Sequence, residues 1–336
     1  MNEPISVLFV YQDNHLPSSR VRVLNLIPEL QKLDINVTTI CFPKKLNDKL
    51  QLIRILRCFN VVFLQKKLLS YLDSIYIRFL SKCLVYDFDD AIYYRDDSSS
   101  SPYSSSRDHK FRRLAKISDI VIAGNNVLAS HAAKFSHCVE VLPSAVPVDG
   151  VAVKNTYNGN DQIIIGWVGG GGNIHHLSAI GSVLQDLAKK YNIALHVVSN
   201  VQYDLAGVSV VNISWSLEDQ EEQIACFDIG VMPLPDNWWT RGKCGYKALQ
   251  YMASGVPTVC SAVGSNADMI ENGVDGFSVV SLIGFHDALR TLINDSDLRR
   301  TMGTKARMKV DRVYSIQAIA GKLARILRVG CDPVKK

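Results

Sequence analysis

The stretch FDIGVMPLPDNWWTRGKCGYKALQYMASGVP, residues 227–257, combines a short apolar run, a loop with two prolines, a cationic turn and a helical pattern that ends at Gly255. A further apolar run follows directly, at residues 257–261. A strand, a helix and a strand in immediate succession are typical of a parallel sheet with helices on its faces. This stretch therefore favours an α/β fold. The same alternation of strand and helix patterns continues in both directions along the chain.

Short β-branched runs alternate with helical patterns over the whole sequence, as expected of βαβ units. The first series predicts strands at residues 6–11, 36–42, 61–65, 84–87, 119–123 and 139–142. The second series predicts strands at residues 163–168, 194–199, 208–213, 229–234, 257–261 and 276–280. Because both series show the same alternation of strands and helices, they predict two Rossmann-like domains with parallel sheets that face each other across a cleft.

The predicted domain boundaries follow from a change in composition between the two series. Residues 143–161 are rich in Pro, Gly and Asn and lack periodicity, which is typical of a linker. We therefore predict an N-terminal domain over residues 1–148, a linker over 149–161 and a C-terminal domain over 162–312. The remaining residues, 313–336, include a further helical pattern.

The composition excludes several classes of protein. A chain of 336 residues with 47% hydrophobic and 21% charged residues suits two folded domains rather than a disordered chain. The net charge of +5 is small for a protein that binds a nucleic acid backbone, so we expect no nucleic acid partner. The eight cysteines lack metal-ligand spacing, which indicates free thiols. Without a signal pattern or a long apolar stretch, we expect a cytoplasmic protein.

Consecutive glycines follow the strand predicted at residues 163–168, and a helical pattern begins near His175. Glycines let the backbone approach a ligand, and free N–H groups at a helix start favour an anion. We therefore select Gly169, Gly170, Gly171 and Asn173 as candidate ligand-binding residues. A tight turn without a ligand accounts for the same pattern. The next predicted strand is not followed by the acidic residue of a dinucleotide-binding site, which disfavours a dehydrogenase.

Three cations, Arg241, Lys243 and Lys247, fall near the start of a predicted helix, together with Gly242 and Gly245. The helix dipole already places partial positive charge there, so the cations are unfavourable unless an anion neutralises them. A diphosphate would supply that charge, and we predict that Lys243 and Lys247, with Arg241, bind one. Cations that are merely solvated are the alternative.

Residues 243–257 resemble the helix signature of glycosyltransferase group 1, or family 4, a family of retaining GT-B enzymes. Residues 118–123, 263–270 and 272–277 are similar to further motifs of that family. The resemblance implies that the C-terminal domain binds a nucleotide sugar, usually UDP- or GDP-hexose, and that the last helix packs back on the N-terminal domain. It also implies transfer with retention to a glycan or lipid-linked acceptor, in polysaccharide or glycoconjugate synthesis, without a metal or another cofactor.

The sequence departs from this family at its pair of glutamates, spaced E-x7-E. The matching positions are Gly242 and Gln250, so neither carboxylate is present. Gln250 can hydrogen-bond a ribose hydroxyl, and we expect the turn residues Gly242, Cys244 and Gly245 to contact the donor. The missing glutamates leave two alternatives open: a catalytically silent subunit that binds a nucleotide or glycan, and a nucleotide-sugar epimerase of the same fold.

Further candidates lie in the N-terminal half. Arg20 and Arg22 follow the first predicted strand and could meet a phosphate or an acceptor carboxylate, although a plain helix-entry role fits equally. Asp89 and Asp90 occupy the place of a His-Asp pair in the resembled family; one of them is suited to orient the acceptor hydroxyl or accept its proton if burial raises its pKa. Structural hydrogen bonding is the alternative. The string Asp87 to Asp89 is a D-x-D, a metal-binding pattern in glycosyltransferases of the other main fold, but it lies in the wrong domain for a donor metal, and we predict none.

Two tryptophans are candidates for stacking on the donor. Trp238 lies in the loop before the cationic turn and suits a sugar face, whereas Trp215 lies nearer the expected base pocket. Ordinary packing accounts for both residues equally well.

Residues 44–82 are strongly basic and carry apolar residues at helical spacing. Basic amphipathic helices favour an anionic membrane surface, which would place the protein at the inner face of the membrane. Helices with one core face and one solvated face give the same pattern, so a peripheral membrane contact stays one of two interpretations.

Overall fold

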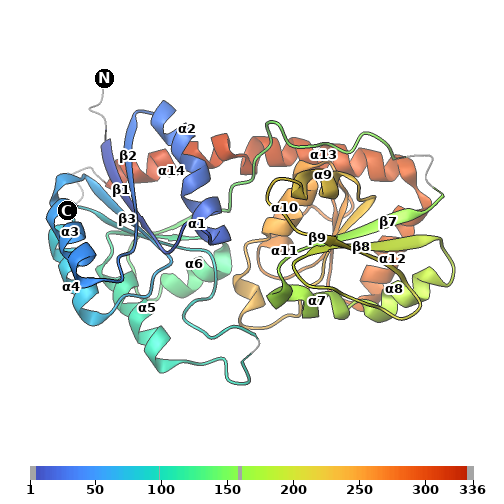
Figure 1. Ribbon diagram of the computed structural model, residues 1–336, viewed down its shortest axis with the longest axis horizontal. Coiled ribbons are helices and arrows are strands. Elements are labelled where there is room, and N and C mark those ends of the chain that lie inside the picture. Colours follow the sequence, from blue (N-terminus) through green and yellow to red (C-terminus); the bar gives the residue numbers. More distant parts are fainter. Residues whose placement is uncertain (1–4, 98, 158–160, 331–336) are drawn as a thin grey trace. The chain divides into compact units, whose positions relative to one another are not determined.

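The computed structural model describes residues 5–97, 99–157 and 161–330 and contains two compact units (Figure 1). Unit 1 comprises Met1–Ala145, Asn237–Cys244 and Ile316–Lys336, and unit 2 comprises Val146–Asp236 and Gly245–Ser315. Each unit has its own sheet and its own core.

Unit 1 is built on a six-stranded parallel sheet in the order β2-β1-β3-β4-β5-β6. The winding direction changes between β1 and β3, which makes the carboxyl ends of these strands a topological switch point. All six predicted strands of this half are confirmed. The strands are β1 Ile5–Tyr11, β2 Ile35–Cys41, β3 Val61–Gln65, β4 Leu84–Phe88, β5 Ile120–Ala123 and β6 Val139–Val141.

Helices cover both faces of this sheet, because alternate residues of its buried strands are apolar on both sides. Leu8 and Val10 belong to a core cluster that includes residues of α3, α4, α5 and α6, whereas Val7 and Phe9 belong to one that includes residues of α2 and α14. Figure 1 shows α14 next to α2, although the two are far apart in sequence. The helices are α1 Pro17–Arg22, η1 Leu24–Leu26, α2 Ile27–Lys32, α3 Leu46–Ile55, η2 Leu56–Cys58, α4 Tyr71–Leu80, α5 Ser105–Ile117, α6 Asn126–Ala132, η4 Thr240–Gly242 and α14 Ile316–Gly330.

Unit 2 has a second six-stranded parallel sheet, in the order β12-β11-β10-β7-β8-β9. This is the Rossmann order, and its switch point lies between β7 and β10. The six strands predicted for this half are confirmed. They are β7 Ile163–Val168, β8 Ile193–Ser199, β9 Ser209–Ser214, β10 Ile229–Met232, β11 Thr258–Ser261 and β12 Phe277–Val279.

The helices of unit 2 also divide between the two faces of the sheet. Leu249 and Val310 lie in the core under α10 and α13, and Leu184 and Leu289 lie in the core under α8 and α12. The helices are η3 Gly171–Asn173, α7 Ile174–Ser178, α8 Gly181–Ala188, α9 Gln220–Ala225, α10 Tyr246–Ala253, α11 Ser265–Met269, α12 Leu282–Asn294 and α13 Ser296–Tyr314. None of the helices in the described part of the chain has the length and apolar character that a membrane crossing requires.

Two segments do not follow a division of the chain into one N-terminal and one C-terminal domain. Asn237–Cys244 belongs to unit 1, although the sequence places it inside the predicted domain 162–312. The described linker residues 149–157 form no helix or strand but are held to unit 2, where the buried Lys154 pairs with Asp228 at 2.9 Å. Residues 158–160 of the predicted linker and residues 331–336 of the last segment lie outside the described residues.

Candidate functional site

The switch point of unit 2 is held open by a side chain. Beyond the pairs Ile229 with Ile165 and Gly230 with Gly166, β7 and β10 form no further ladder pairs. The Tyr251 hydroxyl of α10 lies between them: it accepts from the Val168 N–H at 3.0 Å and donates to the Val231 carbonyl at 3.3 Å. Parallel α/β sheets bind ligands at the carboxyl ends of such diverging strands. No local pattern in the sequence marks Tyr251 as a site residue.

The glycine loop after β7 lies beneath Lys247. A Cβ atom at Gly169 would lie 2.5 Å from the Lys247 ammonium and 2.7 Å from the buried Trp167 ring, so a side chain there would have to displace one or both of them. The same ammonium is 4.1 Å from the centroid of the Trp167 ring, a cation–π contact. The Gly171 N–H donates to the Asn200 side chain at 2.8 Å, which fixes the loop to the end of β8. The structure therefore brings the predicted residues Gly169 and Lys247 together at the switch point.

Helix α10 begins in a conformation that requires glycine. Gly245 has a φ of +68°, in the left-handed region, and precedes the first helical residue, Tyr246. A Cβ at Gly245 would lie 2.9 Å from the Asn266 side-chain oxygen. Lys247 is thus in the first turn of α10, where the N–H groups of the helix add to its positive charge. The exposed Gly170 and the half-buried Asn173 lie in the loop after β7.

Hydrogen bonds link the side chains of Gln250 in α10, Gln220 and Trp215. Gln250 is buried and donates to the Gln220 side-chain oxygen at 3.1 Å. The same oxygen accepts from the Trp215 indole N–H at 3.2 Å. Gln220 therefore links two predicted binding residues, and it was missed because nothing in its local sequence marks it. One N–H of the Gln250 amide is engaged in this bond, so its carbonyl oxygen and its second N–H can contact a ligand.

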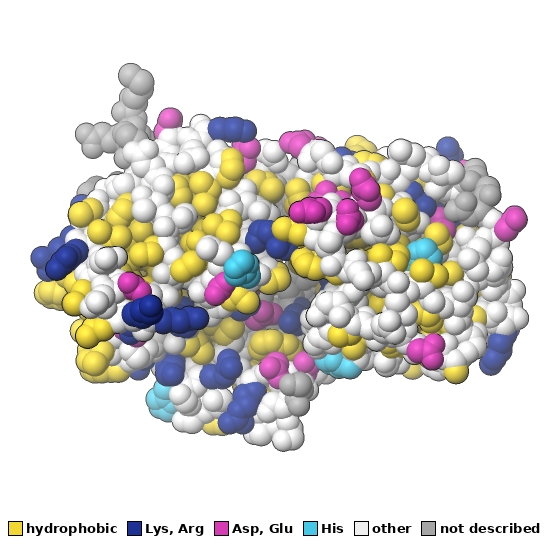
Figure 2. Space-filling view, in the orientation of Figure 1, with side chains coloured by type: hydrophobic (Ala, Val, Ile, Leu, Met, Phe, Trp, Pro, Cys, Tyr) yellow, Lys and Arg dark blue, Asp and Glu magenta, His cyan; other side chains and the backbone are white. Residues whose placement is uncertain are grey.

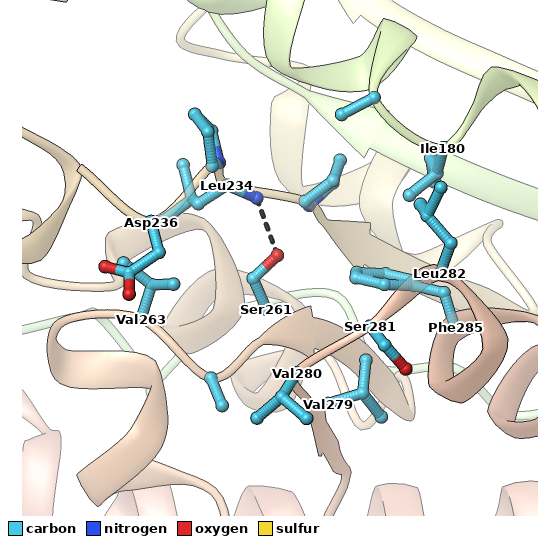
Figure 3. Close-up of a pocket in the computed structure, with 14 residues that line it drawn as sticks. Ile180, Leu234, Asp236, Ser261, Val263, Val279, Val280, Ser281, Leu282 and Phe285 are labelled. Atoms are coloured by element: carbon cyan, nitrogen blue, oxygen red, sulfur yellow. Dashed lines mark hydrogen bonds between the residues drawn. The ribbon is translucent and has the colours of Figure 1, made fainter.

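A pocket of about 410 Å³ lies at the same end of this sheet, beyond β10 and β11 (Figure 3). Its wall is mostly apolar, with Ile180, Leu282 and Phe285 on one side in Figure 3. The Leu234 N–H donates to the Ser261 hydroxyl at 2.8 Å, and Asp236 is the charged residue of the lining. Because its described lining contains a carboxylate and no cation, this pocket is unsuited to a diphosphate.

The cationic turn is divided between the two units, and part of it has a structural role. Arg241, Gly242, Lys243 and Cys244 belong to unit 1, whereas Gly245 and Lys247 belong to unit 2. The carbonyl oxygens of Arg241 and Lys243 accept from the Asn125 side chain at 3.3 and 3.1 Å. Of the three predicted cations, only Lys247 lies in α10; Arg241 lies in η4, and Lys243 directly follows it.

Gly242 and Cys244 fix this turn to unit 1 rather than forming an obvious ligand contact. A Cβ at Gly242 would lie 2.7 Å from the Ala91 nitrogen, so the position of the family's first glutamate has no room for a side chain. The Cys244 thiol donates to the Asp89 carbonyl at 3.1 Å, and desolvation raises the pKa of that thiol. Packing explains both residues.

Lys243 forms part of a compact charge cluster in unit 1. Its ammonium lies 3.3 Å from Asp90 and 4.8 Å from the centroid of the Trp239 ring. Lys66, from the end of β3, pairs with Asp89 at 2.8 Å and also with Asp90. Lys243 is therefore paired with an acid, and the expectation that it is one of the diphosphate-binding cations is not supported.

The charge cluster sets the protonation state of Asp90. Burial alone would raise the pKa of Asp90, but Lys66 and Lys243 outweigh burial and lower it. Conversely, Asp89 and Asp90 outweigh the desolvation of Lys66 and raise the pKa of its ammonium. The condition for a base role, a raised carboxyl pKa, is thus not met. Asp90 is an ionised hydrogen-bond acceptor. Lys66 was not predicted as a member of this cluster, because its acidic partners are more than 20 residues away in the sequence.

Arg22 is a buried structural residue, which corrects its assignment to ligand binding. Its Nε donates to Asp87 at 3.2 Å, a second nitrogen of the guanidinium pairs with the same carboxylate, and a third donates to the Leu142 carbonyl at 2.6 Å. Asp87 is fully buried at the end of β4. Arg20, on the same short helix, is half-buried and forms no ion pair with a described residue.

Trp238 lies in unit 1, next to the charge cluster in sequence. It is half-buried, and its indole N–H has no hydrogen-bond partner among the described residues. Trp215, in unit 2, is 38% exposed. Both rings are therefore partly accessible, and neither is a fully buried core residue.

Residues 163–295 match the model of a protein family described as glycosyl transferases group 1. This match covers most of unit 2 but less than half of the 336-residue chain. It includes the glycine loop, Gln250 and Lys247. None of the curated protein sequences compared with the chain matches it.

Several solved structures share the fold at low sequence identity. The Anabaena protein HepE, solved with UDP and glucose, is 13% identical with a TM-score of 0.70, covering 97% of this chain and 100% of that one. Sucrose-phosphate synthase from Thermosynechococcus elongatus is 13% identical with a TM-score of 0.73, covering 97% and 98%. A glycosyltransferase from Rickettsia africae is 13% identical with a TM-score of 0.72, covering 99% and 100%. Two Rossmann-like domains with these neighbours define the GT-B fold, and the fold class predicted from the sequence is confirmed.

Proposed function

We propose that this protein is a glycosyltransferase that moves a hexose from a UDP- or GDP-linked donor to a glycan or lipid-linked acceptor. One observation carries the proposal: Lys247 lies over the glycine loop at the switch point of unit 2, within the segment that matches glycosyl transferases group 1. The presence of UDP in the HepE structure supports a uridine nucleotide. Synthesis of a polysaccharide or glycoconjugate is the process that such an acceptor implies.

In the proposed reaction, unit 2 binds the donor. The Lys247 ammonium and the N–H groups of α10 and of the glycine loop face the diphosphate, and the carbonyl oxygen of Gln250 accepts from a ribose hydroxyl. The acceptor oxygen forms a bond to C1 as the bond from C1 to the β-phosphate oxygen breaks, and the anomeric configuration is retained. The hydroxyl proton leaves with the nucleoside diphosphate. Lys247 stabilises the charge that develops on the leaving group.

In the same proposal, Asp90 orients the acceptor. Because Lys66 and Lys243 keep it ionised, Asp90 can accept a hydrogen bond from the acceptor hydroxyl without taking its proton. Asp89 contributes indirectly, since it neutralises Lys66. Lys243 is then a positioning residue for Asp90 rather than a donor ligand.

We propose that the reaction needs no metal ion. The carboxylates of the D-x-D string already have cationic partners, since Asp87 pairs with Arg22 and Asp89 pairs with Lys66. A metal at this string would have to displace both partners, one of which is fully buried. The cationic Lys247 supplies the counter-charge for the diphosphate instead.

The donor assignment can be tested with one substitution and a matched control. Lys247→Ala is expected to lower donor turnover by about 10²- to 10³-fold, the usual loss when one charge-stabilising donor is removed. Lys189→Ala, an exposed lysine of the same unit, is expected to leave it unchanged. Release of UDP or GDP from each nucleotide sugar, with and without acceptor, is measured by chromatography. Equal turnover in both variants would rule out the donor assignment.

The same assay separates the alternatives that the missing glutamates leave open. Thermal stabilisation by a nucleotide sugar without any turnover would indicate a silent binding subunit. Conversion of the sugar without an acceptor would indicate an epimerase. The anomeric configuration of the product, read by NMR, tests retention.

We further propose that unit 1 contacts an anionic membrane surface. Five apolar side chains of α3 and α4 form an exposed apolar ridge, and three of them are more than 70% exposed. The ridge consists of Leu46, Leu50, Leu72, Ile75 and Phe79, with exposures of 72%, 46%, 75%, 47% and 77%. Other apolar residues of these helices, Leu52 and Ile77, are already in the core. The ridge is thus a second apolar face, which a helix with one core face and one solvated face would lack.

Exposed basic side chains occur on the same helices and at their ends. Lys45, Arg54 and Lys82 are exposed, and the Arg57 guanidinium lies 5.9 Å from the centroid of the Phe79 ring. Figure 2 shows hydrophobic and basic side chains side by side at the margin of the molecule where Figure 1 labels α3 and α4. Apolar insertion combined with attraction to anionic lipid headgroups is the pattern of interfacial membrane binding.

Sedimentation with lipid vesicles tests this surface. Binding to phosphatidylcholine vesicles that contain phosphatidylglycerol is expected, and the double variant Leu72→Ser with Phe79→Ser should weaken it by about tenfold or more, because each buried apolar side chain contributes about 1.5–3 kcal/mol. Val280→Ser, which changes a 92% exposed apolar residue of unit 2, is the control. Equal loss in both variants, or no binding by the unaltered protein, would contradict the proposal.

A further inference from the structure

A second pocket, of about 600 Å³, lies entirely within unit 1 and is not explained by donor binding. Gln12, Lys66 and Asp90, which follow β1, β3 and β4, line it. It therefore lies at the switch point between β1 and β3, the position where parallel α/β sheets bind ligands. We call it the unit 1 pocket.

The lining of the unit 1 pocket is strongly cationic. It contains Lys66, Lys67, Arg107 and Lys110, against the single acid Asp90. Lys66 is neutralised by Asp89 and Asp90, but in the described part of the chain Lys67, Arg107 and Lys110 form no ion pair with a carboxylate. Three cations without an acidic partner around one cavity favour an anionic ligand.

The environment of these cations holds two of them in place. The Lys67 ammonium lies 5.5 Å from the centroid of the Phe42 ring, and Arg107 donates to the Ile92 carbonyl at 3.4 Å. Ser104 and Ser106 line the pocket at the start of α5, a helix of 13 residues whose N–H groups add positive potential there. Ser104 and Ser106 thus form part of the pocket wall.

We infer that the unit 1 pocket binds an acceptor that carries a phosphate group. The phosphate lies among Lys67, Arg107 and Lys110, and the hydroxyl to be glycosylated lies toward the ionised Asp90. Leu68, Ile92 and Trp239 supply an apolar wall for the rest of the acceptor. The identification of the ligand as an acceptor rests on the proposed function, whereas anion binding by the pocket does not.

Two kinds of molecule offer this chemistry, a lipid phosphate and a soluble sugar phosphate, and calorimetric titration of the full chain distinguishes them. The probes are farnesyl phosphate in detergent and glucose 6-phosphate, with farnesol and glucose as uncharged references. Tighter binding of farnesyl phosphate indicates a lipid-linked acceptor, and tighter binding of glucose 6-phosphate indicates a soluble one. If neither phosphate binds more tightly than its uncharged reference, the proposal is overturned.

The matched variants are Lys110→Ala and Lys116→Ala, two lysines of the same helix of which only Lys110 lines the pocket. Lys110→Ala is expected to weaken phosphate binding by about tenfold, the loss of one charge-assisted contact. Lys116→Ala is expected to leave it unchanged, and an equal effect of both would overturn the proposal.

Stabilisation by UDP keeps this test separate from the proposed function. If Lys110→Ala retains the UDP-induced thermal shift, the variant is folded and its donor site is intact. If the unaltered protein shows no shift with UDP or GDP but binds the phosphate probes, the donor assignment fails and the pocket assignment stands.

Discussion

The two switch points of this protein have the same position in their sheets but are lined by different kinds of residue. At the carboxyl ends of β1, β3 and β4 in unit 1, the charged side chains nearest the strands are paired with one another: Arg22 with Asp87, and Lys66 with Asp89 and Asp90. At the carboxyl ends of β7 and β10 in unit 2, glycines and Lys247 surround the opening that Tyr251 holds apart.

This difference indicates a division of roles. In unit 1 the protein supplies both signs of charge, so the cluster fixes the protonation state of Asp90 before any ligand arrives. In unit 2 glycines remove the side chains that would fill the space, so a ligand can approach the backbone of the loop and the first turn of α10, which carries Lys247. A paired charge cluster suits a group that must be oriented, whereas an open glycine loop suits a group that must be enclosed.

The largest expected effect concerns the buried pair of unit 1. Arg22→Met should lower the free energy of unfolding by about 3–5 kcal/mol, because it leaves the carboxylate of Asp87 buried without a partner. Urea unfolding measures the loss, and hydrogen exchange at β4 assigns it to unit 1. Arg20→Met, on the same helix, should change it by less than about 0.5 kcal/mol. Equal effects would mean that the buried pair is not what distinguishes unit 1.

The next effect concerns the opening in unit 2. Tyr251→Phe should destabilise unit 2 by about 1–3 kcal/mol, because the Val168 N–H and the Val231 carbonyl lose their buried partner. Hydrogen exchange at β7 and β10 measures the loss. Tyr203→Phe is the control, since the Tyr203 hydroxyl has no hydrogen bond to a described residue. Unchanged protection of both strands would show that the hydroxyl does not hold the opening.

A smaller effect tests whether the glycine loop serves the donor. Gly169→Ala should lower donor turnover by about tenfold or more, because the new Cβ displaces the Lys247 ammonium from its position. Gly172→Ala, where a Cβ meets nothing within 4 Å, should leave turnover unchanged. A steady-state assay of nucleotide release compares the two. A loss shared by both variants would point to the backbone of the loop rather than to Lys247.

A test by pH separates the acids of unit 1 from a histidine. Burial, and then Lys134, lowers the pKa of His131 to about 4, and its ring stacks on Tyr93 at 3.7 Å. The unfolded chain takes up this proton near pH 6.5 and the folded chain does not, so stability should fall as the pH drops from about 6.5 to about 4.

The paired Asp90 should not contribute over that range, because its lowered pKa keeps its stabilising effect intact until the pH falls below the ordinary carboxyl range. His131→Gln should therefore flatten the dependence of the unfolding free energy on pH, measured by urea unfolding at several pH values. An unchanged slope in this variant would assign the dependence to another group.

The fold was accessible from the sequence because each strand is a short β-branched run with its own boundaries. All twelve predicted strands occur, and β7 coincides with its predicted range, residues 163–168. The glycine loop and Lys247 were also accessible, because glycines after a strand and a cation at a helix start have local meaning.

The remaining site could not be predicted because it depends on contacts between distant residues. Neighbours in sequence gave no sign that Lys243 belongs to unit 1, since its partners, Asp90 and Asn125, are more than a hundred residues away. Lys66 looked like one cation of a basic segment, and Arg22 like an exposed cation at a helix entry. Their partners become visible only when β1, β3 and β4 lie side by side.

Helix α14 has a consequence for the order in which the molecule forms. Its residues Leu323 and Leu327 cover the same face of the unit 1 sheet as Leu26 and Leu30. On the ribosome, residues 5–145 emerge long before residues 316–330, and all of unit 2 is synthesised in between. Nascent unit 1 therefore exposes an apolar sheet face for most of translation, and a chaperone can bind that face. Unit 2 can complete its folding before α14 is synthesised.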